Sequence, residues 1–527
     1  MAARFWVTGG TGNWNSTTNW SATSGGASGA SVPGSADTAA LDASSGSGTV
    51  TLNISPDIQT LTCTGFTGTL AFGTNTISLN STGTIFTGAT TMTVTGTPQI
   101  ICTNSSATAR TISPGAVTEA NSISFRITAG TGTLSLGTNG AYLDLDFTDG
   151  TNPTGYAGQL GGGSITVYGN FKASTGMTQQ SVSNTITFAA TSGAKTIITA
   201  GVTFDRPFTF NGVGGTWQLF GALTTGATRT VTLTNGTLSL LFYTLTTGIF
   251  SSNNSNARTI DFGGAGKIVL TGTGATLFTT STATNLTVIG TNPLIQLTTN
   301  STTGTRGVIL GAAGEANAIS VDVTAGSDQI NLGTTTGAYR NVDFTGFTGT
   351  HNAQNSIAVF GNWNYGGVTA VSGTSAVTFA ATSGTKTVTS NGVTFPANVA
   401  FNGIGGTWAC QDALSVTNVL TLANGTLKLK SGTTSTVGSF VTSGTNPKFL
   451  VSTTLGTPAT ISDASGTNTV SYLTVQDNIA TGGAIWDALD ITNVDAGGNS
   501  GWLFSTTPSI GNEITMRLRS FTQPRRF

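Results

Sequence analysis

The sequence predicts an all-β protein, a parallel β-helix-like solenoid built from an internal duplication. Three observations predict this fold. Thr fills about a fifth of the 527 positions and Gly fills 73 of them, apolar residues alternate in short runs, and long motifs recur at a fixed offset. Thr, Ser, Asn and Gly are poor helix formers, whereas Thr and Val favour strands. A string of tandem β-sandwich domains is the alternative, because it gives the same local pattern.

The low charge of the chain limits the chemistry that it can perform. Charged residues make up 7% of the sequence, the net charge is −1, and there is one His. An ordinary globular protein is about a quarter charged. We therefore expect a protein that is not an enzyme, with no catalytic residue, no cofactor and no metal. The near-neutral balance also argues against a nucleic-acid surface, which needs a basic stripe, and the 37% apolar content argues against disorder.

Two repeat units occupy most of the chain. Four motifs recur in the same order, the first three at an offset of 191 residues: FAATSG at 188 and 379, GVTF at 201 and 392, FNG-x-GGTW at 210 and 401, and NGTL at 235 and 424. Weaker matches upstream extend the copies to residues 83–274 and 275–450. The unique flanks, 1–82 and 451–504, are expected to cap the array, since terminal repeats need a protected outer face. Residues 505–527 form a basic tail.

Each part of the chain has a local pattern that fits this plan. In the first flank, Trp6, Trp14 and Trp20 are expected to close the core or to contact a glycan. In the repeat units, apolar residues two apart predict short strands with one buried face. Coils of roughly 20 to 25 residues would stack about 4.8 Å apart and align outward Thr and Asn side chains in ladders. Trp486 and Trp502 take the capping or glycan-contact places in the second flank.

The acids in the first repeat unit resemble a calcium loop at first sight. Asp144, Asp146 and Asp149 supply oxygen ligands close together, but they lack the EF-hand spacing. In the second copy the corresponding positions hold Asn341, Asp343 and Gly346. We therefore expect a turn hydrogen-bonded by its Asp side chains rather than an ion site.

The remaining acids do not identify a catalytic pair. Glu119 and Glu315 occupy equivalent repeat positions and are interpreted as turn or cap residues. The densest acidic group lies in the second flank and consists of Asp477, Asp487, Asp490 and Asp495. A glycosidase needs two carboxylates that face each other across a substrate, and the sequence does not show which of these acids converge.

Six further residues are expected to be structural. His351 lies in a Gly-Thr-His-Asn segment with no partner motif, which predicts a solvated turn residue. Trp217 and Trp408 recur inside FNG-x-GGTW and are expected in the core. Three widely spaced Cys without a CxxC pair predict buried thiols, with neither a disulfide framework nor a zinc site: Cys63, Cys102 and Cys410.

The tail and the first residues bear on partners and location. Arg517, Arg519, Arg525 and Arg526 lie among the last eleven residues without an acid, so the tail either docks on an acidic partner surface or stays solvated. The start lacks the apolar stretch of a secretory signal, and no apolar run is long enough to insert in a membrane. We expect synthesis in a cytoplasm without secretion by the general route.

Both ends of the chain resemble one group of proteins. The strings Arg4-Phe5-Trp6-Val7, Gly12-Asn13-Trp14 and Asn19-Trp20-Ser21 open the sequence, and Val470-Ser471-Tyr472-Leu473 and Asn499-Ser500-Gly501-Trp502 lie near its other end. They resemble Thr/Gly-rich repeat structural proteins of tailed bacteriophages, which are fibre-like or decorate the particle. The resemblance covers nearly the whole chain up to Phe504 and transfers no catalytic residue.

The function expected from these observations is that of a phage virion structural protein, such as a fibre, spike or head or tail decoration. It would assemble in the host cytoplasm, bind other virion proteins and adhere to a host-surface polysaccharide. Fibres are often homotrimers, but no heptad segment here specifies one. A bacterial surface adhesin and a tailspike polysaccharide depolymerase are the two alternatives.

Overall fold

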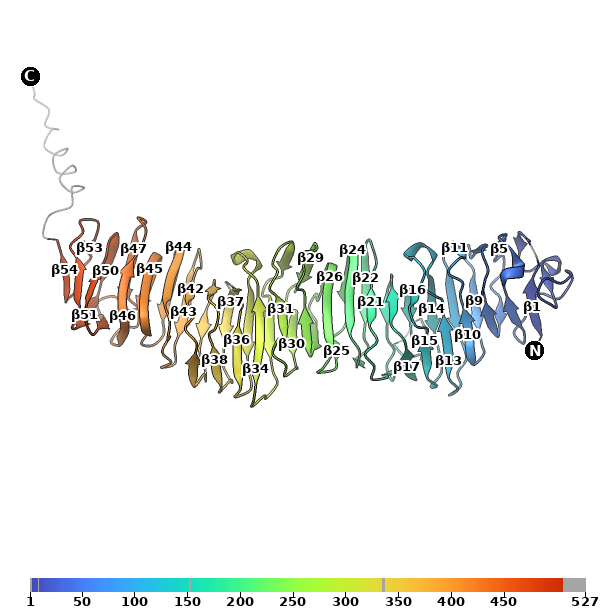
Figure 1. Cartoon of the computed structure of the whole chain (residues 1–527), viewed down its shortest axis with the longest axis horizontal. Coiled ribbons are helices and arrows are strands. Elements are labelled where there is room, and N and C mark those ends of the chain that lie inside the picture. The colour runs from blue at the N-terminus through green and yellow to red at the C-terminus, as the bar shows by residue number, and fades with distance from the viewer. Residues whose placement is uncertain (1, 8, 151–152, 334–336, 506–527) are drawn as a thin grey trace, which may run out of the picture. The chain divides into compact units, whose positions relative to one another are not determined.

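The computed structural model describes residues 2–7, 9–150, 153–333 and 337–505. The chain divides into two compact units. Unit 1 comprises Met1–Gly272 and Thr284–Pro293, and unit 2 comprises Thr273–Ala283 and Leu294–Phe527. In each unit, short strands follow one another around successive coils (Figure 1).

The strands of unit 1 form stacks in which neighbours are hydrogen-bonded. One stack contains β1 (Ala3–Trp6), β3 (Trp20–Ser21), β4 (Thr38–Ala40), β7 (Thr60–Thr62), β10 (Gly83–Thr87), β13 (Arg110–Ser113), β15 (Leu134–Leu136), β17 (Gln159–Gly162) and β20 (Thr178–Gln179). A second contains β6 (Asp57–Ile58), β9 (Thr76–Leu79), β12 (Gln99–Cys102), β14 (Ile123–Ile127), β16 (Gly140–Asp146), β18 (Ile165–Val167), β19 (Phe171–Lys172), β21 (Ile186–Phe188), β22 (Ala194–Ile198), β24 (Phe208–Leu219), β26 (Thr230–Ser239), β28 (Ile249–Ser251), β29 (Arg258–Asp261) and β32 (Leu286–Ile289). Two shorter stacks contain β2 (Gly12–Asn13), β5 (Thr49–Thr51), β8 (Thr69–Ala71) and β11 (Thr93–Thr95), and β23 (Thr203–Phe204), β25 (Leu223–Thr225), β27 (Thr244–Thr247) and β30 (Lys267–Leu270).

Unit 2 is built in the same way. Its longest stack contains β33 (Leu294–Leu297), β35 (Ile319–Val323), β37 (Gly337–Asp343), β39 (Ile357–Val359), β40 (Trp363–Asn364), β42 (Val377–Phe379), β43 (Thr385–Thr389), β44 (Val399–Cys410), β45 (Ser415–Leu429), β46 (Thr434–Thr442), β47 (Lys448–Ser452), β48 (Ala459–Asp463), β50 (Leu473–Gln476), β51 (Asn478–Gly482) and β53 (Val494–Asp495). The others contain β31 (Phe278–Thr280), β34 (Thr305–Leu310), β36 (Gln329–Leu332), β38 (Thr350–Asn352) and β41 (Ala370–Ser372), and β49 (Thr467–Thr469), β52 (Ile485–Ala488) and β54 (Trp502–Phe504).

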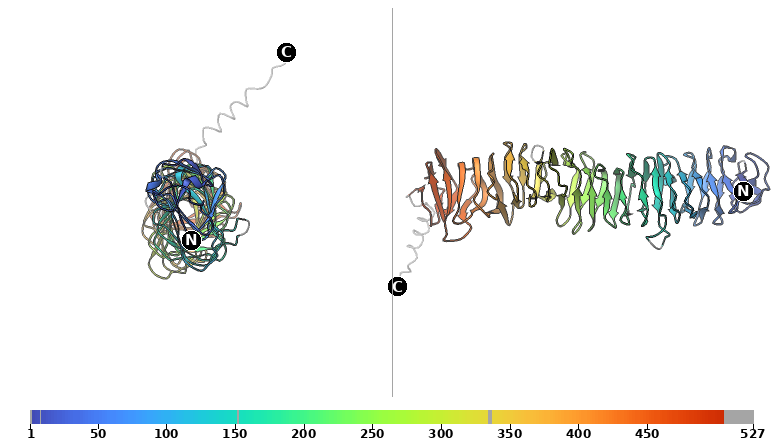
Figure 2. Two further views of the ribbon diagram at one scale, coloured as in Figure 1. Left: turned by 90° about the vertical axis from the view of Figure 1, so that its right-hand side faces the viewer. Right: turned by 90° about the horizontal axis from the view of Figure 1, so that it is seen from below.

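Apart from the antiparallel pair of β1 and β3, stacked strands run parallel, and their register shifts only at a few bulges. Ala39 lies opposite Leu61 on the next coil, a spacing of 22 residues, and Ile100 lies opposite Phe125, a spacing of 25. Alternate residues of many strands point inward, as the buried and half-buried positions of Ile77 to Leu79 illustrate. The coils of each unit therefore follow one behind another (Figure 2). This arrangement confirms the predicted β-solenoid, and its parallel ladders exclude tandem sandwiches, whose sheets are antiparallel.

Helical structure among the described residues is limited to single 3₁₀ turns. They are η1 (Thr17–Asn19), η2 (Ala43–Ser45), η3 (Glu119–Asn121) and η4 (Glu315–Asn317). No described helix has the length and apolar character that crossing a membrane requires. The low helix propensity of the Thr, Ser, Asn and Gly in the sequence thus agrees with the structure.

The repeated motifs form one packing module that occurs once in each unit. Phe188 of FAATSG stacks on Phe210 of FNG-x-GGTW, with ring centroids 5.1 Å apart and planes 13° from parallel. The second copy repeats this geometry between Phe379 and Phe401, at 4.9 Å and 13°. Trp217 and Trp408 are fully buried beside these rings, as the sequence predicts.

A close backbone approach explains the glycines of the same module. A Cβ atom on Gly212 would lie 1.9 Å from the carbonyl oxygen of Ala190, and one on Gly403 would lie 1.8 Å from that of Ala381. Any side chain at either position would push two coils apart. The spacing of FAATSG and FNG-x-GGTW is therefore set by one coil of the solenoid, because it brings the Ala and Gly backbones together.

Candidate functional site

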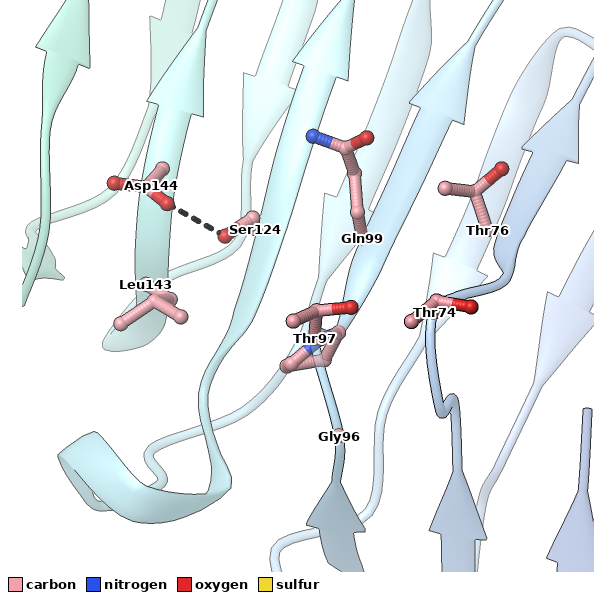
Figure 3. A pocket seen from close by; sticks show the side chains of 9 residues that line it. Thr74, Thr76, Gly96, Thr97, Gln99, Ser124, Leu143 and Asp144 are labelled. Carbon is pink, nitrogen blue, oxygen red and sulfur yellow. Dashed lines mark hydrogen bonds between the residues drawn. The ribbon is translucent and has the colours of Figure 1, made fainter.

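An outward-facing groove in unit 1 is the candidate site. It has a volume of about 390 Å³ and runs along the outer face of the stacked strands β9, β12, β14 and β16. Figure 3 shows Thr76, Gln99, Ser124 and Asp144 on these neighbouring strands, each from a different coil. A smaller hollow of about 110 Å³ shares Gln99, Ser124 and Asp144 and continues the polar lining. We refer to the two together as the unit 1 groove.

A bulge in β16 positions the central carboxylate of the groove. Ile123 pairs with Tyr142 and Phe125 pairs with Leu145, so two residues of β16, Leu143 and Asp144, lie opposite one residue of β14. Such a bulge re-aims side chains at the surface of a sheet. The register of β37 shifts in the same way in the second copy, so the bulge belongs to the repeat.

Asp144 belongs to a polar ladder that crosses four successive coils. Its Oδ2 accepts a hydrogen bond from the hydroxyl of Ser124 at 2.8 Å, and its Oδ1 accepts from the backbone and side-chain amides of Asn170 at 2.6 and 2.9 Å. Asn170 in turn accepts from the backbone N–H and hydroxyl of Thr196 at 2.8 and 2.9 Å. The carboxylate is therefore a crosslink between coils.

Two cations line the deeper part of the groove around Asp146. Oδ2 of Asp146 lies 3.5 Å from Nε of Arg126 and 3.9 Å from Nζ of Lys172. Its Oδ1 accepts from the backbone N–H and hydroxyl of Thr148 at 2.9 and 2.6 Å. Asp343 makes the same two bonds with Thr345 in the second copy. The prediction of an Asp-bonded turn is thus confirmed in both units.

The second copy keeps the ladder but changes the charges. Asn341 donates to Ser320 and accepts from the backbone of Asn362, as Asp144 bridges Ser124 and Asn170. Asp322 and Asn364 occupy the positions of Arg126 and Lys172. In the strand register they lie opposite Asp343, one on each neighbouring strand. A hollow of about 350 Å³ near this ladder includes Arg340 and Lys386. Both hollows therefore contain two cations, but those of unit 2 lie at other positions than Arg126 and Lys172.

The groove offers hydrogen-bonding groups of both kinds on a fixed backbone. Hydroxyls of Thr74, Thr76 and Thr97, the amide of Gln99, and the partly exposed Arg126 and Lys172 face outward along it. Both Asp carboxylates already hold coils together. The arrangement is suited to binding a polar, hydroxyl-rich chain, and its shallow form on a sheet face fits an extended ligand better than an enclosed small molecule.

The three N-terminal tryptophans lie inside the cap. Trp6, Trp14 and Trp20 are fully buried. The ring of Trp20 packs edge-on against Trp6 at 5.3 Å and against Trp14 at 4.8 Å, and its Nε1 donates to the carbonyl of Trp14 at 2.7 Å. β3 pairs antiparallel with β1, which places Trp20 opposite Trp6. Their ring faces are covered by the protein.

The two C-terminal tryptophans also lie in the core. Trp486 and Trp502 are opposite each other on consecutive coils, with ring centroids 5.0 Å apart. Both are buried, and Nε1 of Trp502 donates to Asn478 at 3.0 Å.

The acids near these tryptophans do not converge on a common cleft in the described residues. Asp477 is buried and accepts from the backbone of Gly456 at 2.9 Å. Asp487, Asp490 and Asp495 bond to residues two positions ahead, which forms local turns. The bonds from Thr492 hold the pKa of Asp490 below its ordinary value. The tail arginines Arg517, Arg519, Arg525 and Arg526 lie outside the described residues.

His351 corrects one sequence prediction. It is not a solvated turn residue but an inward position of β38, 2% exposed, where it lies opposite Ile330. Its ring packs among Phe344, Trp363 and Tyr365, and Nδ1 lies 3.3 Å from the Tyr365 hydroxyl. Burial lowers the pKa of His351 to about 4. The imidazole is therefore neutral at pH 7 and inaccessible to a ligand.

The glutamates and cysteines have the structural roles that the sequence predicts. Glu119 begins η3, and its Oε2 accepts from the hydroxyl of Thr191 at 2.6 Å. Glu315 begins η4 and makes the same bond, also 2.6 Å, with Thr382. All three cysteines are unpaired and buried, and burial raises the pKa of each thiol to about 12. Among the described residues, no three His, Cys, Asp or Glu side chains gather as a metal site requires.

No protein-family model, curated protein or solved structure matches the chain. The site is therefore interpreted from its own geometry. Sequence reasoning missed Gln99, Arg126 and Lys172, because they are far apart in the chain and belong to no motif. The signal was present in the coil spacing: outward positions about 25 residues apart come together once the register of the coils is known.

Proposed function

We propose that the protein is a non-enzymatic structural component of a phage virion, a fibre, spike or decoration that adheres to host-surface polysaccharide. The observation that carries this proposal is the division between the inside and the outside of the coils. Inward positions are filled mainly by aromatic and aliphatic side chains, and several outward positions form ladders of amides and hydroxyls. A solenoid of this kind has a rigid, extended outer surface, and its filled core leaves no room for a deep pocket.

The outer ladders support the adhesive part of the proposal. Asn235 donates to Asn211 at 2.7 Å in unit 1. In unit 2, Asn446 donates to Asn424 at 2.8 Å, and Asn424 donates to Asn402 at 2.7 Å. Polysaccharides present the same hydroxyl chemistry at regular intervals. Together with the cationic lining, the unit 1 groove is the place where we expect an acidic glycan chain to lie, with Arg126 and Lys172 as its anionic-group contacts.

The virion assignment is tested on purified particles. Mass spectrometry of density-gradient-purified phage encoding this chain is expected to find it at a fixed ratio to the major capsid protein, and immunogold labelling is expected to locate it at one site on the particle. Absence of the chain from particles would contradict the assignment.

The adhesive role needs a separate measurement. Binding of the purified protein to host capsular polysaccharide is expected to weaken about tenfold in Lys172→Ala, which loses one charge-assisted contact. Asn364→Ala, at the equivalent position of unit 2, is the matched control and is expected to bind as the wild type does. If Lys172→Ala bound the polysaccharide as tightly as Asn364→Ala does, the unit 1 groove would not be the adhesion site. Shortening of the polysaccharide by the wild-type protein would favour a depolymerase instead.

A further inference from the structure

The last coil of unit 2 lacks the kind of cover that closes the first coil of unit 1. At the N-terminal end, β3 folds back antiparallel along β1, and three indoles pack behind it. In the described residues, β53 and β54 instead stand last in their stacks, with a hydrogen-bonded neighbour on one side. An uncovered strand edge has unpaired backbone N–H and C=O groups that can pair with another strand. Repeat proteins therefore usually cover their terminal coils with a capping segment.

Apolar and acidic side chains surround this uncovered end. Leu489, Ile491 and Val494, which follow β52, are 54%, 65% and 51% exposed. Residues 451–504 contain five Asp and no Lys, Arg or His. Of these acids, Asp487, Asp490 and Asp495 lie on or between β52 and β53, close in sequence to the exposed apolar residues. A segment with one apolar face and one basic face would therefore complement this surface.

The tail that follows has these two properties. In Glu513–Phe521, apolar residues alternate at Ile514, Met516 and Leu518, and Arg517 and Arg519 occupy intervening positions. Alternation with a period of two is the pattern of a strand with one buried face. Residues 505–527 carry four Arg and one Glu, opposite in sign to the five Asp of the preceding module.

The coil spacing also brings this segment to the right place. Thr474 of β50 lies opposite Val494 of β53, a step of 20 residues. A further step of 20 from Val494 reaches Ile514, where the alternating pattern begins. We propose that residues 513–521 pair with the uncovered edge of β53 in the same chain and cap the solenoid, with the apolar side chains over the last coil and the arginines beside its aspartates.

Hydrogen exchange of the full-length protein tests the cap. The peptide spanning residues 491–504 is expected to exchange about tenfold more slowly in the wild type than in the variant Ile514→Ser/Met516→Ser/Leu518→Ser, because pairing protects edge amides. Ile510→Ser, an apolar tail residue before the alternating segment, is the matched control and should exchange as the wild type does. In the variant Arg517→Gln/Arg519→Gln, the exchange rate of this peptide should lie between those of the wild type and the triple variant. Added salt should reduce the difference in exchange rate between this variant and the wild type. Equal exchange in the wild type and the triple variant would overturn the proposal.

A crosslink distinguishes the tail of the same chain from that of a second copy. Val494→Cys combined with Ile514→Cys is expected to form a disulfide within one chain on mild oxidation, since the native thiols are buried. Val494→Cys combined with Ile510→Cys should crosslink much less. A crosslinked dimer, or protection of residues 491–504 that disappears on dilution, would show that a second copy supplies the tail and would overturn the proposal as stated.

Discussion

Arg306 and Asp328 form a two-pronged ion pair from which solvent is excluded. Nε and Nη2 of the arginine lie 2.8 and 2.9 Å from the two carboxylate oxygens, and both side chains are fully buried. The same guanidinium donates to the carbonyls of Thr299 and Ala325. In the first copy Arg110 makes the equivalent carbonyl bonds but lies over the ring of Tyr156 instead of a carboxylate. The arginine at this inward position therefore packs against a carboxylate in one copy and an aromatic ring in the other.

Removal of one partner of this pair should be costly. Asp328→Ala leaves a charged guanidinium buried without a counterion, and we expect the free energy of unfolding of unit 2 to fall by about 3 to 5 kcal/mol. Urea unfolding followed by hydrogen exchange at residues 305–332 measures the loss. The double variant Arg306→Met/Asp328→Leu removes both charges and should be within about 1 kcal/mol of the wild type. A loss below about 1 kcal/mol in the single variant would contradict the prediction.

A second buried arginine should behave in the opposite way. Arg206 is fully buried, its Nη2 donates weakly to the carbonyls of Gly162 and Gly163 at 3.3 Å, and its Nε and Nη1 have no hydrogen-bond partner among the described residues. Burial lowers its pKa to about 10. Arg206→Met should therefore raise the stability of unit 1 by roughly 1 kcal/mol, because an apolar side chain has no such desolvation cost. A lower melting temperature than that of the wild type would count against this account.

His351 should make the stability of unit 2 sensitive to acid. Its pKa is lowered to about 4 in the folded protein, against 6.5 in the unfolded chain. Between these values the unfolded chain binds a proton that the folded chain does not, so stability falls as the pH drops from 6.5 to 4. The loss should reach about 3 kcal/mol.

The first copy supplies the control for this effect. Leu160 occupies the corresponding inward position, opposite Leu134. His351→Leu should therefore lose less stability than the wild type between pH 7 and pH 4.5, as measured by thermal unfolding at both values. Carboxylates contribute equally to the two proteins, so the difference isolates the histidine. Identical pH profiles would exclude a role for His351.

The close approach within the repeated module predicts a large effect from one methyl group. Gly403→Ala places Cβ against the carbonyl oxygen of Ala381, and we expect the stability of unit 2 to fall by about 3 kcal/mol. Gly314→Ala is the matched control, because a Cβ there has no atom within 4 Å. Thermal unfolding of both variants should separate them clearly. Equal melting temperatures would show that the coils move apart without cost.

The sequence was sufficient for the fold because the solenoid repeats itself. FAATSG and FNG-x-GGTW recur with the spacing that brings Phe188 over Phe210 and Phe379 over Phe401, so one duplicated pattern encoded both packing modules. The burial of Trp217, Trp408 and the three cysteines followed from their apolar character and isolation.

The register between coils could not be predicted from local sequence. This register determines which residues point inward and which side chains of different coils meet. Gly-Thr-His-Asn has the composition of a turn, yet pairing with Ile330 makes His351 an inward strand residue. Arg126 meets Asp146 because Phe125 pairs with Leu145 after a bulge, and no local pattern marks a bulge between strands. The tail, which the sequence associated with an acidic partner surface, now has a specific candidate surface within the same chain.

The bond from Thr382 to Glu315 joins residues 67 positions apart. Glu315 precedes β35 and Thr382 follows β42, and β35, β37, β39 and β42 are successive neighbours in one stack. The contact from Thr191 to Glu119 spans 72 positions in the same way. If a mechanical load pulled on the chain, the coils enclosed by either contact could not peel away singly. The coils that one contact encloses should therefore unfold together. The force needed would depend on the surface hydrogen bonds of Glu315 and Glu119.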